Sequence, residues 1–95
     1  MLRNSKLLPL DVTEKDWIIQ TQLSYEQNQE LKHVGRWAFA IPKNKLNETW
    51  KYARRLYKND ELVNCKYLMC STGADAKSKN GTIMFFFMRV PRMKH

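Results

Sequence analysis

The chain has 95 residues, of which 17 are Lys or Arg and 9 are Asp or Glu, so its formal net charge is +8. This length allows one domain, and 43% apolar residues suffice for a small core, which excludes a multidomain machine and argues against a wholly disordered chain. No apolar run approaches the ~20 residues of a membrane helix, and residues 1–30 lack the apolar stretch of a secretory signal. We therefore expect a cytoplasmic protein, or a nuclear one in a eukaryotic host, with no membrane partner.

The N-terminal part of the chain is predicted to contain an arm and one strand. Residues 1–12 are interpreted as a flexible arm, and residues 13–95 as a single domain. Over residues 16–24, apolar and polar residues alternate and β-branched residues are common, which favours a strand. A helix stays open as the alternative, because Trp17 and Tyr25 also fall on one helical face.

A second strand and a helix follow. Residues 35–41 are predicted to form a strand, which Pro42 ends because proline has no backbone N–H to donate. One face of this strand contains Trp37, Phe39 and Ile41. The helix is predicted from about residue 44 to residue 59, with Asn44 as its N-cap. Its apolar stripe has spacings of four, three and four and consists of Leu46, Trp50, Ala53 and Tyr57.

Two more strands are predicted after the helix. Residues 64–71 alternate, and this pattern places Cys65, Tyr67 and Met69 on one side and Lys66, Leu68 and Cys70 on the other. A polar loop spans residues 71–81, and a nearly continuous apolar run over residues 82–90 predicts a central strand covered on both faces. The expected fold class is therefore α+β: a mainly antiparallel sheet of about four strands with one main helix packed on one face.

Charge is segregated along the chain. Residues 1–31 contain three basic and five acidic residues, whereas residues 32–95 contain fourteen basic and four acidic residues. A concentrated positive field attracts nucleic acid or an acidic protein surface. The residues predicted to contact nucleic acid are Arg36, Lys43, Lys45, Lys51, Tyr52, Arg54, Arg55, Lys58, Lys66, Lys77 and Lys79. The alternative for the helix cations is a solvated face without a ligand.

Exposed aromatic residues would add base stacking to such a surface. The candidates are Trp37, Tyr52, Tyr57 and Tyr67. Each is also a candidate core residue, and Tyr52 is the best exception because it lies off the apolar stripe and between basic residues. The lysine-containing loop over residues 71–81 resembles a phosphate-wrapping loop in composition, but its spacing does not match a P-loop, and a plain hairpin loop is the simpler interpretation.

Residues able to catalyse a reaction or bind a metal are few. Cys65 and Cys70 form no Cys-x-x-Cys pair, and the two histidines are His33 and the terminal His95. This pattern excludes a disulfide-rich scaffold and predicts no metal site. No Ser-His or Cys-His spacing indicates a nucleophile, so the sequence favours a protein without catalytic residues or cofactors.

Three short motifs stand out along the chain: Gly35-Arg36-Trp37, Glu48-Thr49-Trp50 and the strand from Lys66 to Ser71-Thr72. Together they resemble the pattern of a family of phosphothreonine-lyase-like proteins whose fold is similar to that of cap-binding translation initiation factors. In the lyases a strand lysine acts as base and a histidine acts as acid. The resemblance implies that Lys66 corresponds to the lysine, but Ala38 stands where the histidine would be, which puts elimination chemistry in doubt.

Two other segments are Phe39-Ala40-Ile41 followed by the Tyr/Lys-rich helix, and residues 83–87 followed by Pro91-Arg92. This pattern resembles the origin-binding domain of polyomavirus large T antigens. Related replication initiators have a metal-binding histidine pair on the last strand, which this chain lacks between Thr82 and Phe87. Both resemblances imply the same strand–helix–strand–strand unit.

Three functions follow from these patterns. The first is a non-catalytic module that binds nucleic acid phosphates through the basic helix face and the lysine-containing loop. The alternative is an interaction module, an inhibitor or effector, that docks on an acidic partner protein, and the third is a phosphate-handling lyase-like enzyme using Lys66 and Arg36. Homodimerisation is also expected, because a chain of 95 residues has few other elements that could cover both faces of the strand at residues 82–90.

Overall fold

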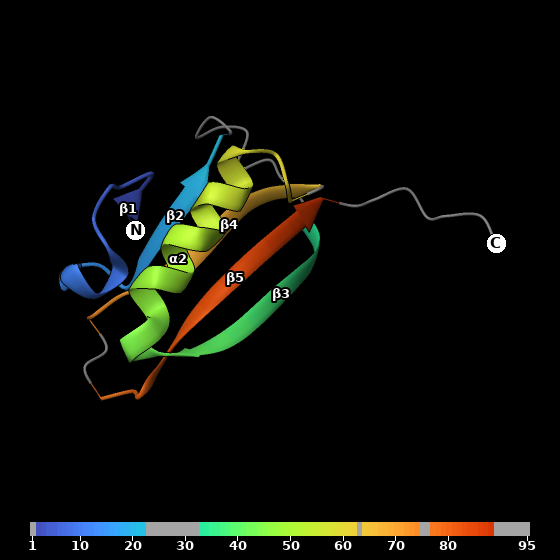
Figure 1. Cartoon of the computed structure of the whole chain (residues 1–95). Coiled ribbons are helices and arrows are strands. Elements are labelled where there is room, and N and C mark those ends of the chain that lie inside the picture. The colour runs from blue at the N-terminus through green and yellow to red at the C-terminus, as the bar shows by residue number, and fades with distance from the viewer. Residues whose placement is uncertain (1, 23–32, 63, 75–76, 89–95) are drawn as a thin grey trace.

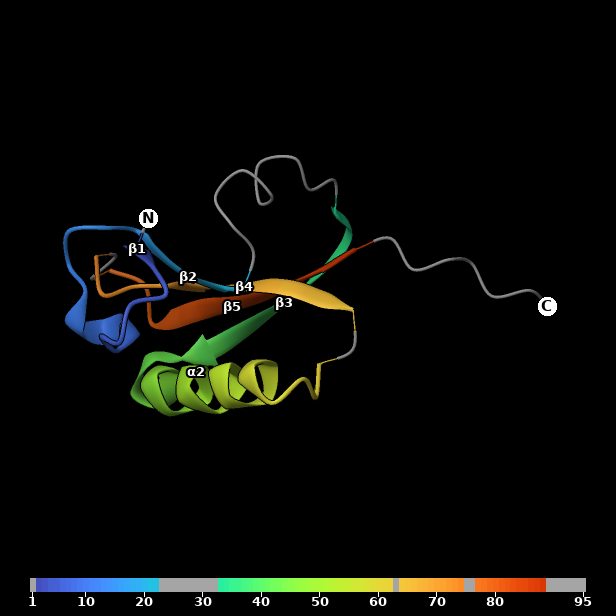
Figure 2. The same ribbon diagram turned by 90° about the horizontal axis from the view of Figure 1, so that it is seen from above.

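The computed structural model has one sheet and one helix packed on it, and it describes residues 2–22, 33–62, 64–74 and 77–88. Its elements are β1 (Leu2–Arg3), the 3₁₀ turn η1 (Pro9–Asp11), β2 (Trp17–Thr21), β3 (His33–Pro42), α2 (Lys43–Lys58), β4 (Cys65–Ser71) and β5 (Asn80–Met88). The strand order is β1-β2-β4-β5-β3. The pairs β2–β4, β4–β5 and β5–β3 are antiparallel, and β1 is parallel to β2. Helix α2 lies along one face of the sheet (Figures 1 and 2). The predicted α+β class is thereby confirmed.

The core lies between α2 and the strands β2, β4 and β5. The predicted stripe of α2 is confirmed, since Leu46, Trp50, Ala53 and Tyr57 are all buried. Their main partners on the sheet are Ile18, Leu68, Cys70 and Ile83, each no more than 1% exposed. Gly81 allows close approach, because a Cβ atom there would lie 2.5 Å from the Cδ2 atom of Leu46. A basic helix with one apolar stripe therefore packs flat on an apolar sheet.

The start of α2 differs from the prediction. Asn44 was expected as N-cap but is the second helical residue, and the N-cap is Pro42, which has no side-chain capping hydrogen bond. The reason is that β3 runs into α2 without a loop. Pro42 has a φ of −53° and a ψ of 138°, so it ends the strand and turns the chain directly into the helix.

A bulge in β4 changes which residues face the helix. The pairing of β4 with β5 shifts between Cys65 and Tyr67, so that Lys66 is the extra residue. Cys65 is paired with Phe87 and joins the core on the helix side, whereas Tyr67 faces the other side. The predicted alternation, with Cys65 and Tyr67 on the same side, is therefore wrong at this position, because one inserted residue reverses the side on which all earlier residues lie.

The N-terminal segment packs against the domain instead of extending from it as an arm. The backbone N–H of Asn4 donates to the carbonyl oxygen of Ile19 at 2.7 Å. The N–H of Leu10 donates to Oδ1 of Asn47 on α2 at 3.0 Å, and Pro9 and Val12 are buried. The segment thus forms one end of the folded unit. Among the described residues, no helix is both long enough and apolar enough to cross a membrane.

Tyr57 and the turn after it fix the C-terminal end of α2. The hydroxyl of Tyr57 donates to the carbonyl oxygen of Lys66 at 2.6 Å and accepts from the N–H of Gln22 at 2.9 Å. Asp60 follows with a φ of 59°, and its N–H donates to the carbonyl oxygen of Tyr57 at 3.1 Å. This left-handed residue reverses the chain and brings Leu62 against the core.

Candidate nucleic-acid interface

The outer face of α2 displays three of the ten predicted cations, together with Tyr52. Because the apolar stripe faces the sheet, residues three and four positions apart on the opposite side point to solvent. The side chains of Lys51, Tyr52, Arg55 and Lys58 are exposed there. Glu48, Lys51, Tyr52 and Arg55 line a shallow depression on this face. We call Lys51, Tyr52, Arg55 and Lys58 the basic helix face.

Arg55 and Tyr52 form a cation–π pair within this face. The Cζ atom of Arg55 lies 5.2 Å from the centroid of the Tyr52 ring. Tyr52 is 54% exposed, so the pair is accessible to a ligand. Within the described part of the chain, neither Arg55 nor Lys51 forms an ion pair with the neighbouring Glu48. The guanidinium is therefore oriented by an aromatic ring while its hydrogen-bond donors stay open to an anion.

Arg54 has a different environment from Arg55. The sequence predicts both as exposed, but Arg54 is half-buried, and its Nε donates to Oε1 of the buried Gln20 at 3.2 Å. Arg54 lies on the flank of α2 that faces β2, so it ties the helix to the sheet. Its contribution to a phosphate site is secondary, and replacing it would also disturb packing.

A second group of lysines lies at the start of α2. The backbone N–H of Lys43 donates to the carbonyl oxygen of Lys79 at 3.1 Å, which joins the loop between β4 and β5 to the first turn of the helix. Lys45, Lys77 and Lys79 are exposed, and Lys43 is half-buried. The lysine-containing loop therefore lies beside the N-terminal end of α2, next to the surface of the helix.

Two predicted residues lie away from this surface. Arg36 is exposed on β3, and its pairing with Phe86 places it on the sheet face that α2 does not cover. Lys66 is half-buried in the β4 bulge, and its carbonyl oxygen accepts the Tyr57 hydroxyl. A flat ligand on the basic helix face cannot contact either side chain, so the structure does not unite all of the predicted cations in one site.

The aromatic candidates also separate. Tyr57 is buried in the core, and Tyr67 is half-buried and stacked on Phe86 with ring centroids 4.5 Å apart. Tyr52 and Trp37 are exposed, and Trp37 reaches 63%. Of the four, these two are therefore accessible for stacking, and they lie on different elements.

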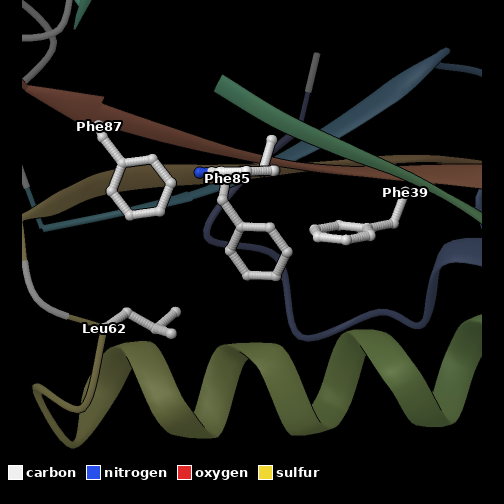
Figure 3. A pocket seen from close by; sticks show the side chains of 5 residues that line it. Phe39, Leu62, Phe85 and Phe87 are labelled. Carbon is white, nitrogen blue, oxygen red and sulfur yellow. The ribbon is translucent and has the colours of Figure 1, made fainter. Parts of the chain in front are cut away.

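Sequence reasoning missed one exposed aromatic surface. Phe39 is 46% exposed, and its ring meets that of Phe85 edge-on at 5.8 Å. A groove beside α2 is lined by Trp37, Phe39, Leu62, Phe85 and Phe87 (Figure 3). The signal that could have revealed it is Pro42, since proline within a sheet marks an edge strand, and an edge strand is covered least.

The cysteines do not offer a nucleophile. Burial raises the pKa of the Cys65 thiol to about 11 and that of Cys70 to about 12. Both thiols are therefore protonated near pH 7, and a protonated thiol is a poor nucleophile. Among the described residues, no three His, Cys, Asp or Glu side chains come together in a way that could hold a metal ion.

Comparisons of the chain with protein-family models, with curated proteins and with solved structures give no significant match. The two family resemblances stay predictions, and the geometry described above is the basis for assigning a function.

Proposed function

We propose that the protein is a non-catalytic module that binds nucleic acid phosphates through the basic helix face and the adjacent lysines of the β4–β5 loop. The observation that supports this most directly is the exposed Tyr52–Arg55 pair, with ring and guanidinium 5.2 Å apart, flanked by the exposed Lys51 and Lys58. Such a surface combines positive charge, which contacts the phosphates of the backbone, with an aromatic ring, on which a base can stack.

The spacing of the cations fits a run of phosphates. From Lys51 to Lys58 the helix rises by about 10 Å, at ~1.5 Å per residue. This length matches about three nucleotide steps of ~3.4 Å along one strand of a duplex. Lys43 and Lys45 lie about two turns before Lys51, and Lys79 adjoins Lys43, so the contact can extend beyond the helix centre. The ligand would be DNA or RNA in the cytoplasm or nucleus.

Fluorescence anisotropy with four labelled oligonucleotides tests the proposal. Single- and double-stranded DNA and RNA of one length are titrated at salt concentrations between ~50 and ~200 mM. We expect binding to at least one form, with log K falling linearly against log salt. Neutralising about three phosphates predicts a slope of roughly −2 to −3.

A pair of charge-matched variants locates the surface. Lys51→Glu/Arg55→Glu reverses two exposed cations of the basic helix face, and Lys6→Glu/Lys15→Glu makes the same change in net charge at two exposed N-terminal lysines. We expect the first variant to lose at least ~10-fold in affinity and about two units of salt slope. The second should keep the slope of the unmodified protein, because its charges lie outside the proposed contact.

Three outcomes would contradict the proposal. Equal losses in the two double variants would mean that net charge alone causes binding. Affinity that does not respond to salt, or weak binding of all four nucleic acids, would point to the alternative, an acidic partner protein, which a pull-down would then seek.

A further inference from the structure

Strand β3 forms one edge of the sheet, and no other described strand pairs with its outer side. In the strand order, β3 has β5 as its only neighbour among the described strands. The pairing is regular from Gly35 to Pro42, with a register shift between His33 and Gly35. A bulge at one end and a proline at the other therefore bound an accessible edge over residues 36–40.

The hydrogen-bond pattern shows which backbone groups this edge presents. The backbone N–H of Lys43 donates to the carbonyl oxygen of Lys79. Residues 43 and 79 are therefore a hydrogen-bonded pair, one position beyond the pair of Pro42 with Asn80. Hydrogen-bonded pairs alternate in an antiparallel ladder, so odd-numbered residues of β3 bond to β5 and even-numbered residues point their N–H and C=O groups outward. The N–H of Thr82 supports this, because it donates away from β3, to Oγ of Ser71 at 2.8 Å.

The outward groups therefore belong to Arg36, Ala38 and Ala40, and the side chains around them offer little protection against pairing with another chain. Natural edge strands avoid pairing with other chains through lysines, prolines or inward charges. Here Trp37 and Phe39 are 63% and 46% exposed on the helix side, and Ala38 and Ala40 are exposed on the other side. Arg36 is the single charged residue between Gly35 and Pro42.

We propose that β3 pairs with β3 of a second copy of this chain, antiparallel and with the two-fold axis at Ala38. This register is central to the open edge, because 38 is the midpoint of residues 36–40. It makes Ala38 hydrogen-bond to its mate and Arg36 to Ala40 of the partner subunit, giving roughly six backbone hydrogen bonds.

The side chains are complementary in this register. Trp37 lies opposite Phe39 of the partner subunit, twice, at the narrow non-hydrogen-bonded positions where cross-strand side chains are closest. Aromatic pairs are among the most favourable cross-strand neighbours. Each Arg36 lies opposite an alanine, so no like charges face each other, although each chain has a net charge of +8.

The pairing has a fixed consequence for the two helices. A two-fold axis through an antiparallel strand pair is perpendicular to the sheet, so both copies of α2 lie on the same face of one continuous sheet. The second copy also adds a wall to the groove of Trp37, Phe39, Leu62, Phe85 and Phe87, because two of these lining residues, Trp37 and Phe39, belong to β3. The dimer does not depend on the proposed function, and it would display two basic helix faces in one direction.

Sedimentation equilibrium of the protein alone, without nucleic acid, gives the first test. An interface of roughly six backbone hydrogen bonds and two aromatic pairs is small, so we expect a reversible monomer–dimer equilibrium between ~1 and ~500 µM protein. Trp37→Lys removes both aromatic pairs and should weaken the dimer at least ~10-fold. Tyr52→Lys replaces a comparably exposed aromatic residue on α2 and should leave the dimer unchanged. Circular dichroism of each variant verifies that the fold is retained.

Cysteine cross-linking tests the register. In Ala38→Cys the two new thiols would lie on Cα atoms ~5.5 Å apart, within disulfide range. In Ala40→Cys, on the same strand and the same face, they would be ~14 Å apart. We expect the first variant to form a disulfide-linked dimer under mild oxidation and the second not to. The native Cys65 and Cys70 are buried and should not compete.

Three results would overturn the proposal. The first is a monomer at all concentrations, which would leave the edge to a different partner. The second is a dimer that Trp37→Lys does not weaken. The third is cross-linking of Ala40→Cys as readily as of Ala38→Cys. Because no nucleic acid is present, each result is independent of whether the basic helix face binds phosphates.

Discussion

The two halves of the sheet's helix-side face have similar apolar residues but opposite environments. Over β2 and β4, the helix covers Ile18 and Leu68 completely, and Trp50 on α2 is 0% exposed. Over β3, Trp37 is 63% exposed although it also belongs to an apolar stripe. The amino acid types alone do not distinguish these tryptophans, and what differs is whether an element lies above them.

The cause of the difference is the width of one helix. A five-stranded sheet is about 19 Å across, from four spacings of ~4.8 Å, while a helix with its side chains is about 10–12 Å wide. Helix α2 can therefore cover about half of the sheet, and Figure 1 shows it over β2 and β4 while β3 lies beyond it. The uncovered half, which contains β3, is the part of this face that the proposed second copy would contact.

Truncating one tryptophan in each half should give the largest contrast. Trp50→Ala removes a fully buried side chain and should lower the free energy of unfolding by about 3–5 kcal/mol. Trp37→Ala should lower it by no more than about 0.5–1 kcal/mol at a protein concentration where the monomer dominates. Urea unfolding of both variants measures the contrast, and equal losses would show that the β3 half is also covered.

Alkaline pH should weaken the covered half, which contains both thiols. Burial raises the pKa of Cys65 from 9.0 to about 11 and that of Cys70 from 9.0 to about 12. Above pH 9 the unfolded chain loses thiol protons that the folded chain retains, so stability falls as pH rises. We expect a loss of about 2–3 kcal/mol from pH 8 to pH 10 in urea unfolding.

The double variant Cys65→Ala/Cys70→Ala is the control for this pH dependence. It should be less stable at pH 8, because two buried side chains are shortened, but it should lose clearly less stability up to pH 10. The remaining loss comes from Tyr57 and Tyr67, because burial raises the pKa of both phenols as well. A variant that loses as much stability as the unmodified protein would show that the thiols are not the cause.

The two strand glycines should respond differently to a methyl group. Gly81→Ala places a Cβ 2.5 Å from Cδ2 of the fully buried Leu46 and should cost about 1–3 kcal/mol. Gly35→Ala meets nothing within 4 Å and should change stability by less than about 0.5 kcal/mol. Thermal unfolding of both variants checks this, and a large cost at Gly35 would mean that β3 is more crowded than the structure shows.

The smallest expected effect is a gain at the C-terminal end of α2, in the turn after the helix that forms the covered half. Asp60 has a φ of 59°, a conformation that glycine adopts without strain. Asp60→Gly should therefore stabilise the protein by about 0.5–1 kcal/mol in urea unfolding, whereas Asp60→Ala should not. If Asp60→Gly is destabilising, the carboxylate has a role that this turn does not reveal.

Much of the fold could be predicted from local sequence patterns. Alternation identified β2 and β3, and a three-four spacing identified the buried stripe of α2, because each pattern reports directly on a single face. The packing of residues 2–12 could not be predicted, since a two-residue parallel pairing and a buried Pro9 leave no periodic signal. The bulge at Lys66 was missed for a similar reason, because only the pairing with β5 defines it.

The candidate site was predicted less well than the fold. Net charge indicated that cations are abundant, but it could not show that Arg54 bonds to Gln20 or that Lys66 lies in a bulge. The exposure of Trp37 and Phe39 depends on strand order, which sets β3 at the edge, and strand order is a property of the whole sheet. Residues whose role depends on long-range pairing are therefore the ones that the sequence did not place.

An NMR titration of the ¹⁵N-labelled protein with a short oligonucleotide tests the central claim most directly, because it reports on both surfaces at once. We expect shifts at the amides of Lys51, Tyr52, Arg55 and Lys58 and at Lys79 in the adjoining loop, and these shifts should weaken as salt is raised. The amides of β3 between Arg36 and Ala40 should not respond to nucleic acid. Shifts concentrated on β3 and the aromatic groove, with the basic helix face unchanged, would contradict it.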